Sequence, residues 1–118
     1  MTKSDIEKVS DVFEGISAGD VSLATRYIDH KRFVQHNPYA ADGVEGLTRF
    51  IAQSPRDQLQ LTMLRAIQDG CYVVTQAKGQ RSGRNIFFDI FRFEDGLIVE
   101  HWAFSTEAAR QMKAGTLK

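Results

Sequence analysis

The segment from Phe87 to Phe104, FFDIFRFEDGLIVEHWAF, constrains the fold more than any other part of the chain. Two apolar runs flank Asp95-Gly96, and an Asp-Gly pair between such runs is the strongest short-range signal of a β-hairpin. Each expected strand carries one titratable residue among apolar neighbours, Asp89 in the first strand and His101 in the second. Two titratable groups within apolar strands need a structural or a chemical explanation.

The length of the hairpin loop decides whether these two groups can meet. A two-residue loop would place Asp89 across from Trp102 and turn His101 to the other face of the sheet. A three-residue loop from Glu94 to Gly96, with Gly96 left-handed as a bulge, places Asp89 across from His101. Because this register sorts the apolar side chains better, we predict it. Its pairs are Phe93 with Leu97, Phe91 with Val99, Asp89 with His101, and Phe87 with Ala103.

The predicted register gives the hairpin two largely apolar faces. One face surrounds the Asp–His pair with Phe87, Phe91, Phe93, Leu97 and Val99. The other carries Ile86, Phe88, Ile90, Arg92, Ile98, Glu100, Trp102 and Phe104. A chain of 118 residues makes one domain, residues 1–118, with one core, so its own helices can cover only one face. We expect a second copy to cover the other, in a homodimer joined through Phe88, Ile90 and Trp102.

The first half of the chain predicts helices. Ser4 with Glu7 fits a capping box at the start of a helix, and Gly19 closes it. Asp20 can cap a second, shorter helix, and Asp42 with Glu45 opens a third that ends at Ser54-Pro55. Between the second and third helices, the segment Phe33–Asn37 reads as extended, because Pro38 favours an extended residue before it.

From Gln58 onward the apolar period changes from that of a helix to that of a strand. Turns at Asp69-Gly70 and Ser82-Gly83 separate the following strands, which span Cys71–Gln80 and Asn85–Phe93. The sequence therefore predicts a four-stranded antiparallel meander. The tail from Thr106 to Lys118 is polar enough to be a short helical end or a frayed terminus. Helices followed by strands predict an α+β fold, with the helices packed on one face of a curved sheet.

Composition excludes several function classes. Fifteen basic and fifteen acidic residues cancel, and no basic run is interleaved with aromatic residues, so we expect no nucleic-acid partner. The polar start MTKSDIEK predicts no signal peptide, and no apolar run reaches membrane-spanning length, so we expect no membrane partner. Cys71 is the only cysteine, which leaves no internal disulfide and makes the cytoplasm the expected location. The histidines His30, His36 and His101 lack metal-ligand spacing, and no phosphate-binding glycine pattern is present; we expect neither a metal nor a cofactor.

The order of helices, the segment Phe33-Val34-Gln35-His36-Asn37-Pro38, and the run from Asp89 to Trp102, DIFRFEDGLIVEHW, are similar to SnoaL-like proteins. The resemblance covers roughly Asp5 to Ser105. It implies the nuclear transport factor 2-like fold, an α+β cone whose helices and curved antiparallel sheet enclose a deep pocket. Characterised members with this motif close polyketide rings by aldol condensation, and the fold also hosts isomerases, dehydratases and non-enzymes. The family usually has an acid directly after the Trp, where this chain has Ala103.

The Asp89–His101 pair has a chemical and a structural interpretation. As catalytic residues, one could take a proton from the carbon next to a carbonyl while the other hydrogen-bonds the developing enolate. Alternatively, the two form a buried ion pair that holds two strands in register. The expected substrate-binding residues are His36, Asn37, Gln76, Phe87 and Phe91. The segment around His36 could instead stabilise the turn at Pro38, and Gln76 either hydrogen-bonds Asp89 or is an exposed strand residue.

Together these observations predict a small-molecule pocket protein. The leading hypothesis is a cofactor-independent acid–base enzyme of the cyclase, isomerase or lyase type that acts on a small hydrophobic carbonyl compound. The alternative is a non-catalytic small-molecule-binding protein or a dimerising accessory domain of the same fold. The Asp89–His101 pairing favours the enzyme, whereas Ala103 favours the alternative.

Overall fold

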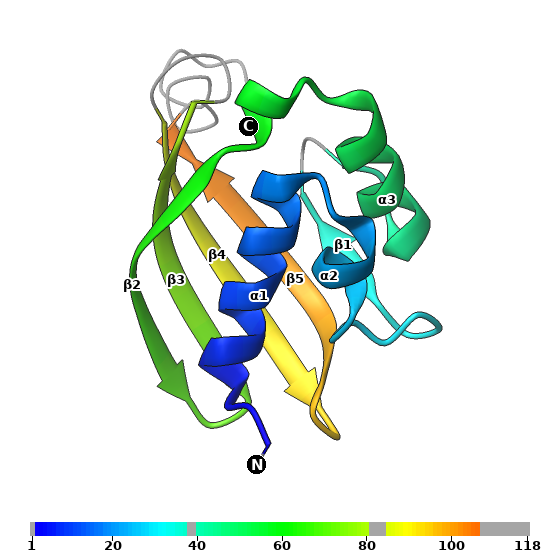
Figure 1. Ribbon diagram of the computed structural model, residues 1–118. Helices are drawn as coiled ribbons and strands as arrows, with labels where there is room; N and C mark the ends of the chain where they lie inside the picture. The colour runs from blue at the N-terminus through cyan, green and yellow to red at the C-terminus, as the bar shows by residue number, and fades with distance from the viewer. Residues whose placement is uncertain (1, 38–39, 81–84, 107–118) are drawn as a thin grey trace, which may run out of the picture.

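A computed structural model describes residues 2–37, 40–80 and 85–106 of the chain. The expected α+β fold is confirmed, with helices followed by a five-stranded curved sheet that does not close into a barrel (Figure 1). The Ser82-Gly83 turn, Pro38 and the tail beyond Thr106 lie outside the described residues. The elements are α1 (Asp5–Ala18), α2 (Val21–Thr25), β1 (Val34–His36), α3 (Gly43–Gln53), the 3-10 helix η1 (Arg56–Leu59), β2 (Leu61–Asp69), β3 (Tyr72–Gly79), β4 (Asn85–Glu94) and β5 (Leu97–Ser105).

The helices begin and end where the local sequence signals predict. Ser4 accepts a hydrogen bond from the backbone N–H of Glu7, whose side chain accepts one from Ser4, and this capping box opens α1. Gly19 ends α1 in the left-handed conformation, with φ of 69°. Asp20 and Asp42 cap α2 and α3. None of the helices in the described part of the chain is long and apolar enough to span a membrane.

The sheet has the strand order β1-β5-β4-β3-β2. The predicted meander is confirmed, because β2, β3, β4 and β5 pair in sequence and all antiparallel. The short strand β1 adds a feature that the meander did not include: it pairs parallel with β5, and Gln35 lies opposite His101. Two segments far apart in the sequence therefore meet at this edge of the sheet.

The β4–β5 hairpin differs from the predicted register. Its loop has two residues, Asp95 and Gly96, both at positive φ, and the expected left-handed Gly96 is confirmed with φ of 77°. One extra residue, Val99, lies in β5 between two successive pairs. The predicted pairs were therefore wrong. The observed pairs include Glu94 with Leu97, Phe93 with Ile98, Arg92 with Glu100, Phe91 with His101, Asp89 with Ala103, and Phe87 with Ser105.

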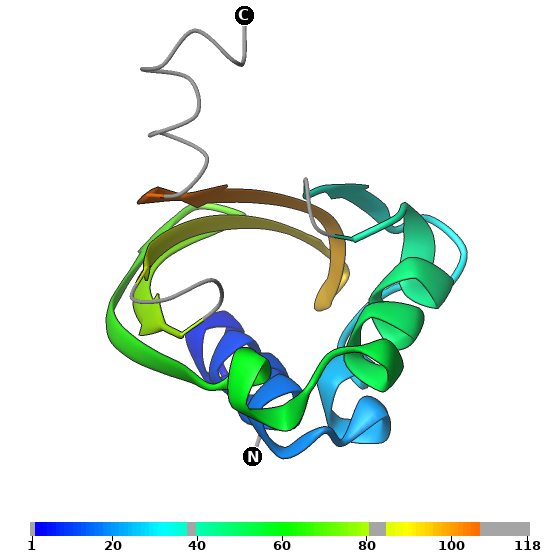
Figure 2. The same ribbon diagram turned by 90° about the horizontal axis from the view of Figure 1, so that it is seen from above.

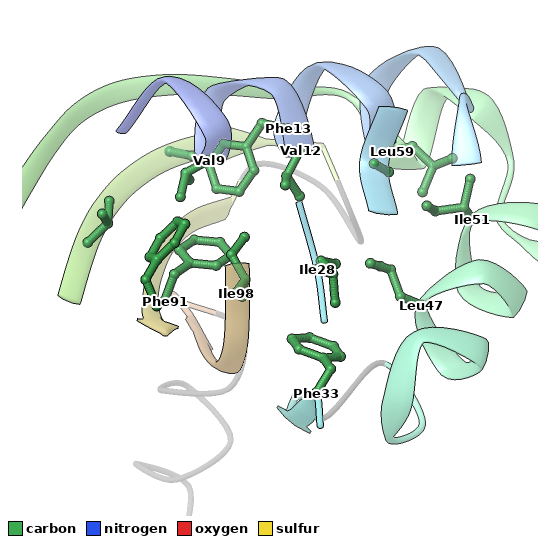
Figure 3. Close-up of a cluster of buried hydrophobic side chains, with 14 residues drawn as sticks. Val9, Val12, Phe13, Ile28, Phe33, Leu47, Ile51, Leu59, Phe91 and Ile98 are labelled. Carbon is green, nitrogen blue, oxygen red and sulfur yellow. The ribbon is translucent and has the colours of Figure 1, made fainter. Parts of the chain in front are cut away.

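The helices that the structure describes lie on the concave face of the sheet, and the core fills the space between the two layers (Figure 2). Figure 3 shows side chains of α1, α3, η1, β4 and β5 converging there, together with Ile28 from the segment after α2 and Phe33 from the segment before β1. Gly15 allows α1 to approach the second helix closely, since a Cβ at this position would lie 2.4 Å from the backbone nitrogen of Ala24. The buried apolar residues that form this core cluster are Val9, Val12, Phe13, Ala24, Ile28, Phe33, Leu47, Ile51, Leu59, Val73, Ala77, Phe91, Phe93 and Ile98.

The convex face of the sheet has no helix over it among the described residues (Figure 2). Ile98 was predicted to lie on this face but is fully buried in the core. The reason is the hairpin register, reinforced by the segment after α2: Ile98 donates its backbone N–H to Tyr27 and accepts one from Asp29. Phe88 and Phe104, which pair with each other on the convex face, remain 45% and 53% exposed.

Candidate functional site

A mostly apolar pocket lies between the helices and the concave face of the sheet. It leaves about 90 Å³ of space for the centres of water-sized molecules, which is more than one water needs. Residues of α1, α3, η1 and four strands form its wall. The polar members are Gln35, Asn37, Gln58, Asp89, His101 and Ser105, and the apolar ones include Val12, Phe13, Ile16, Ile28, Phe33, Leu47, Phe50, Leu59, Leu61, Phe87, Phe91 and Ile98.

Asp89 and His101 meet in this pocket, as the sequence predicted. The Nε2 of His101 lies 2.8 Å from Oδ1 of Asp89, and both side chains belong to residues that are less than one-tenth exposed. They are diagonal neighbours rather than direct partners, because His101 pairs with Phe91 and Asp89 with Ala103. The extra residue in β5 keeps the two side chains on the concave face.

A third polar residue, Gln35, completes the pair and was missed by the sequence reasoning. Its Oε1 lies 2.5 Å from Nδ1 of His101, and Gln35 is also less than one-tenth exposed. The ring of Phe91 stacks on the imidazole, with centroids 4.4 Å apart and an interplanar angle of 11°. The His101 ring is therefore held at both nitrogens and on one face.

His36, expected at the pocket, lies on the convex face instead. Because strand residues alternate, the inward position of Gln35 turns its neighbour outward. His36 Nε2 lies 2.8 Å from Oε2 of Glu100, and its ring stacks on Trp102 with centroids 5.2 Å apart. The hydrogen bond from His36 lowers the pKa of Glu100. His36 therefore belongs to a surface cluster and not to the pocket wall.

Gln76 is also excluded from the pocket by its position in the strand. It pairs with Phe88 on the convex face, so the expected hydrogen bond to Asp89 is not formed. The residue directly opposite Asp89 is Thr75, which is 1% exposed. Among the described residues, its Oγ1 is the buried side-chain polar atom that lacks a hydrogen-bond partner.

The other expected contacts lie in the pocket wall. Asn37, Phe87 and Phe91 all line it, together with the two titratable residues. In the part of the chain that the structure describes, no group of three or more His, Cys, Asp or Glu side chains could hold a metal ion. The chemistry available in the pocket is therefore that of one carboxylate, one imidazole, carboxamides and a hydroxyl.

Comparison with known proteins agrees with this fold. A family model described as SnoaL-like domain matches residues 9–101. IdmH from Streptomyces antibioticus, a candidate polyketide cyclase, superimposes with a TM-score of 0.73 at 21% identity, over 96% of this chain and 99% of that chain. TsrD from Streptomyces laurentii gives the same TM-score and identity over 99% of each chain. An NTF2-like protein of unknown function from Cytophaga hutchinsonii gives a TM-score of 0.77 at 11% identity, over 93% of this chain and 96% of that chain. No curated protein matches the sequence.

Proposed function

The chain belongs to the family of SnoaL-like domains, and on that premise we propose that it is a cofactor-independent acid–base enzyme of the cyclase, isomerase or lyase type. The fold and its pocket are those of a small-molecule-binding protein. The observation that carries the proposal is the buried Asp89–His101 hydrogen bond at the polar end of an otherwise apolar pocket. The substrate class is an apolar carbonyl compound, which the aromatic and aliphatic wall would bind.

Asp89 is the proposed base. Its Oδ1 accepts from His101, whereas no described residue hydrogen-bonds Oδ2, and the side chain lines the pocket. The carboxylate takes a proton from the carbon next to the substrate carbonyl, and the electron pair of the broken C–H bond forms the enolate. The enolate then takes this proton back from Asp89 at another carbon, attacks a second carbonyl whose oxygen takes up the proton, or expels a leaving group that takes up the proton. These three fates correspond to an isomerase, a cyclase and a lyase.

The hydrogen bonds of His101 change the catalytic roles that the sequence predicted for Asp89 and His101. Both ring nitrogens are already engaged, one by Asp89 and the other by Gln35. His101 therefore stabilises the Asp89 carboxylate, and donation to the enolate oxygen falls to the carboxamides of Asn37 or Gln58, which line the same pocket.

Hydrogen exchange at carbon tests this proposal without knowledge of the natural substrate. A panel of cyclic and aromatic ketones is incubated in D₂O with the protein, and loss of the α-hydrogen signal is followed by NMR. Asp89→Asn should slow exchange by about 10²–10⁴-fold, the usual contribution of a general base. His36→Gln, on the convex face, is the matched control and should leave exchange unchanged.

The alternative is a non-catalytic binder, and the same panel distinguishes it. Ligands would then raise the melting temperature of the wild type while their α-hydrogens stay in place. The observation that favours the binder is the pairing of His101 at both nitrogens, which also suits a purely structural triad. Equal exchange by the wild type and Asp89→Asn would also reject Asp89 as the base.

We further propose that the functional unit is a homodimer joined through the convex face of the sheet. Half-exposed Phe88 and Phe104 pair there, and Ile90 lies between Val74 and Trp102 on neighbouring strands. This surface is contiguous and apolar, and a two-fold axis would let it meet its own copy. Other large apolar residues exposed in the chain are Val34, Leu64, Ile67 and Tyr72.

A further inference from the structure

We propose that Gln35 is a positioning residue that keeps a hydrogen on Nδ1 of His101, so that Nε2 is the nitrogen that shares a proton with Asp89. The position of the hydrogen is inferred from geometry alone, and its role in catalysis rests on the proposed function. Three residues from β1, β5 and β4 form one line of hydrogen bonds, Gln35 Oε1 to His101 Nδ1 at 2.5 Å and His101 Nε2 to Asp89 Oδ1 at 2.8 Å.

The position of the hydrogen on His101 follows from which atoms can donate. A carboxamide oxygen has no hydrogen to give, so the Nδ1 that faces Gln35 Oε1 must be the donor. Nε2 then has two states. It either carries a second hydrogen and donates to the Asp89 carboxylate, or accepts one from the Asp89 carboxylic acid. In both states the hydrogen that moves lies between Nε2 and Oδ1.

The residues around His101 oppose a different arrangement of its ring hydrogen bonds. His101 and Asp89 are the only titratable side chains in the described pocket wall, so no third charged group there competes for the ring nitrogens. Phe91 stacks on the imidazole and opposes rotation of the ring. The backbone of Gln35 is also fixed, because its N–H donates to Oδ1 of Asp42, the N-cap of α3, at 2.7 Å.

A fixed hydrogen on Nδ1 determines the charge that His101 carries when it donates to Asp89. With Nδ1 always protonated, the imidazole cannot take the tautomer that carries its single hydrogen on Nε2. A hydrogen on Nε2 therefore makes His101 an imidazolium whose charge stabilises the Asp89 carboxylate, and a neutral His101 accepts instead from the Asp89 carboxylic acid. Without Gln35 the opposite tautomer becomes available, so that a neutral ring donates from Nε2 to the carboxylate and the charge is lost.

The test is the tautomer of His101, observed by NMR with ¹⁵N-labelled histidine. The chain has three histidines, and His30 and His36 serve as internal references. In the wild type we expect Nδ1 of His101 to be protonated throughout the pH range in which the protein is folded. Gln35→Met, which removes the acceptor at similar size, should release this hydrogen and move the neutral ring to the Nε2–H tautomer. Gln35→Glu, which keeps an acceptor in place, should retain the wild-type tautomer.

Gln58→Met is the matched control, because it removes another carboxamide from the same pocket and leaves Gln35 in place. An unprotonated Nδ1 in the neutral wild type, or a tautomer that is the same in Gln35→Met, would overturn the inference. If Gln35→Met does not fold, the comparison of the wild type with Gln35→Glu decides, since a change of tautomer between them would mean that Gln35 donates to the ring. None of these measurements needs a substrate, so failure of the ketone exchange experiment leaves the tautomer result intact.

Discussion

Replacement of Phe88 by Glu should convert a dimer of this protein to a monomer. Phe88 lies on the convex face of the sheet, is 45% exposed in the single chain, and takes no part in the pocket wall. The change therefore perturbs the proposed interface while it leaves the core and the Asp89–His101 pair unchanged. It also places two carboxylates against an apolar surface in each dimer.

The size of the effect follows from the exposed area. A phenylalanine contributes about 200 Å² of surface, so the exposed part of Phe88 is about 90 Å² in each chain. A two-fold interface that covers both copies buries about 180 Å², which is worth about 4.5 kcal/mol at about 25 cal/mol per Å². Loss of that amount would weaken association by about three orders of magnitude, before the cost of burying two charges is added.

Sedimentation velocity at micromolar concentration measures this directly. The wild type should sediment with twice the chain mass of 13.3 kDa, and Phe88→Glu should sediment as the single chain with an unchanged circular dichroism spectrum. Gln53→Glu, which adds the same charge at an exposed position on α3, is the control and should remain dimeric. A monomeric wild type at these concentrations, or a dimeric Phe88→Glu, would refute the reasoning.

Two further predictions concern stability. Thr75→Val removes a buried hydroxyl that lacks a partner, so the free energy of unfolding in urea should rise by about 1–3 kcal/mol; a decrease would mean that the hydroxyl is hydrogen-bonded in solution. The backbone N–H groups of Gln35 and Gly43 lower the pKa of Asp42 below 3.8, so this carboxylate stabilises the fold above that pH and loses its effect as the pH falls through the lowered pKa. Asp42→Ala should therefore reduce the urea midpoint at pH 7 and have a smaller effect below pH 3.8, and an equal effect at both would contradict this assignment.

Local signals in the sequence were sufficient for most of the fold. The capping box of Ser4 and Glu7, the Gly19 helix end and the Asp caps each depend on residues within one turn of the helix, so they can be predicted without tertiary contacts. The hairpin was also predicted from a local signal, Asp95-Gly96 between two apolar runs. Its register was not predicted correctly. A bulge in the loop and a bulge at Val99 both keep Asp89 and His101 on one face, although the two registers pair different residues.

The site residues that lie in one hairpin were predicted, whereas the site residue that comes from a distant strand was missed. Asp89 and His101 are twelve residues apart, and their common face follows from alternation. Gln35 lies 66 residues from His101, and only the parallel pairing of β1 with β5 brings them together. The apolar residue Phe33 could have corrected the prediction for His36. Phe33 faces the core, and alternation from it places Gln35 inward and His36 outward.

The hydrogen bond between Gln35 and His101 also has a consequence for the order in which this protein acquires its structure. Contacts between residues far apart in sequence form slowly, since the loop between them must be closed first. On the ribosome, β1 is made early and must wait until β5 has emerged before Gln35 has a partner. The same holds for Lys8 of α1, whose Nζ donates to the carbonyl oxygen of Gly96, 88 residues later. The helices and strands β2, β3 and β4 can form beforehand, but the polar end of the pocket, which needs β5, is assembled among the last parts of the molecule during synthesis.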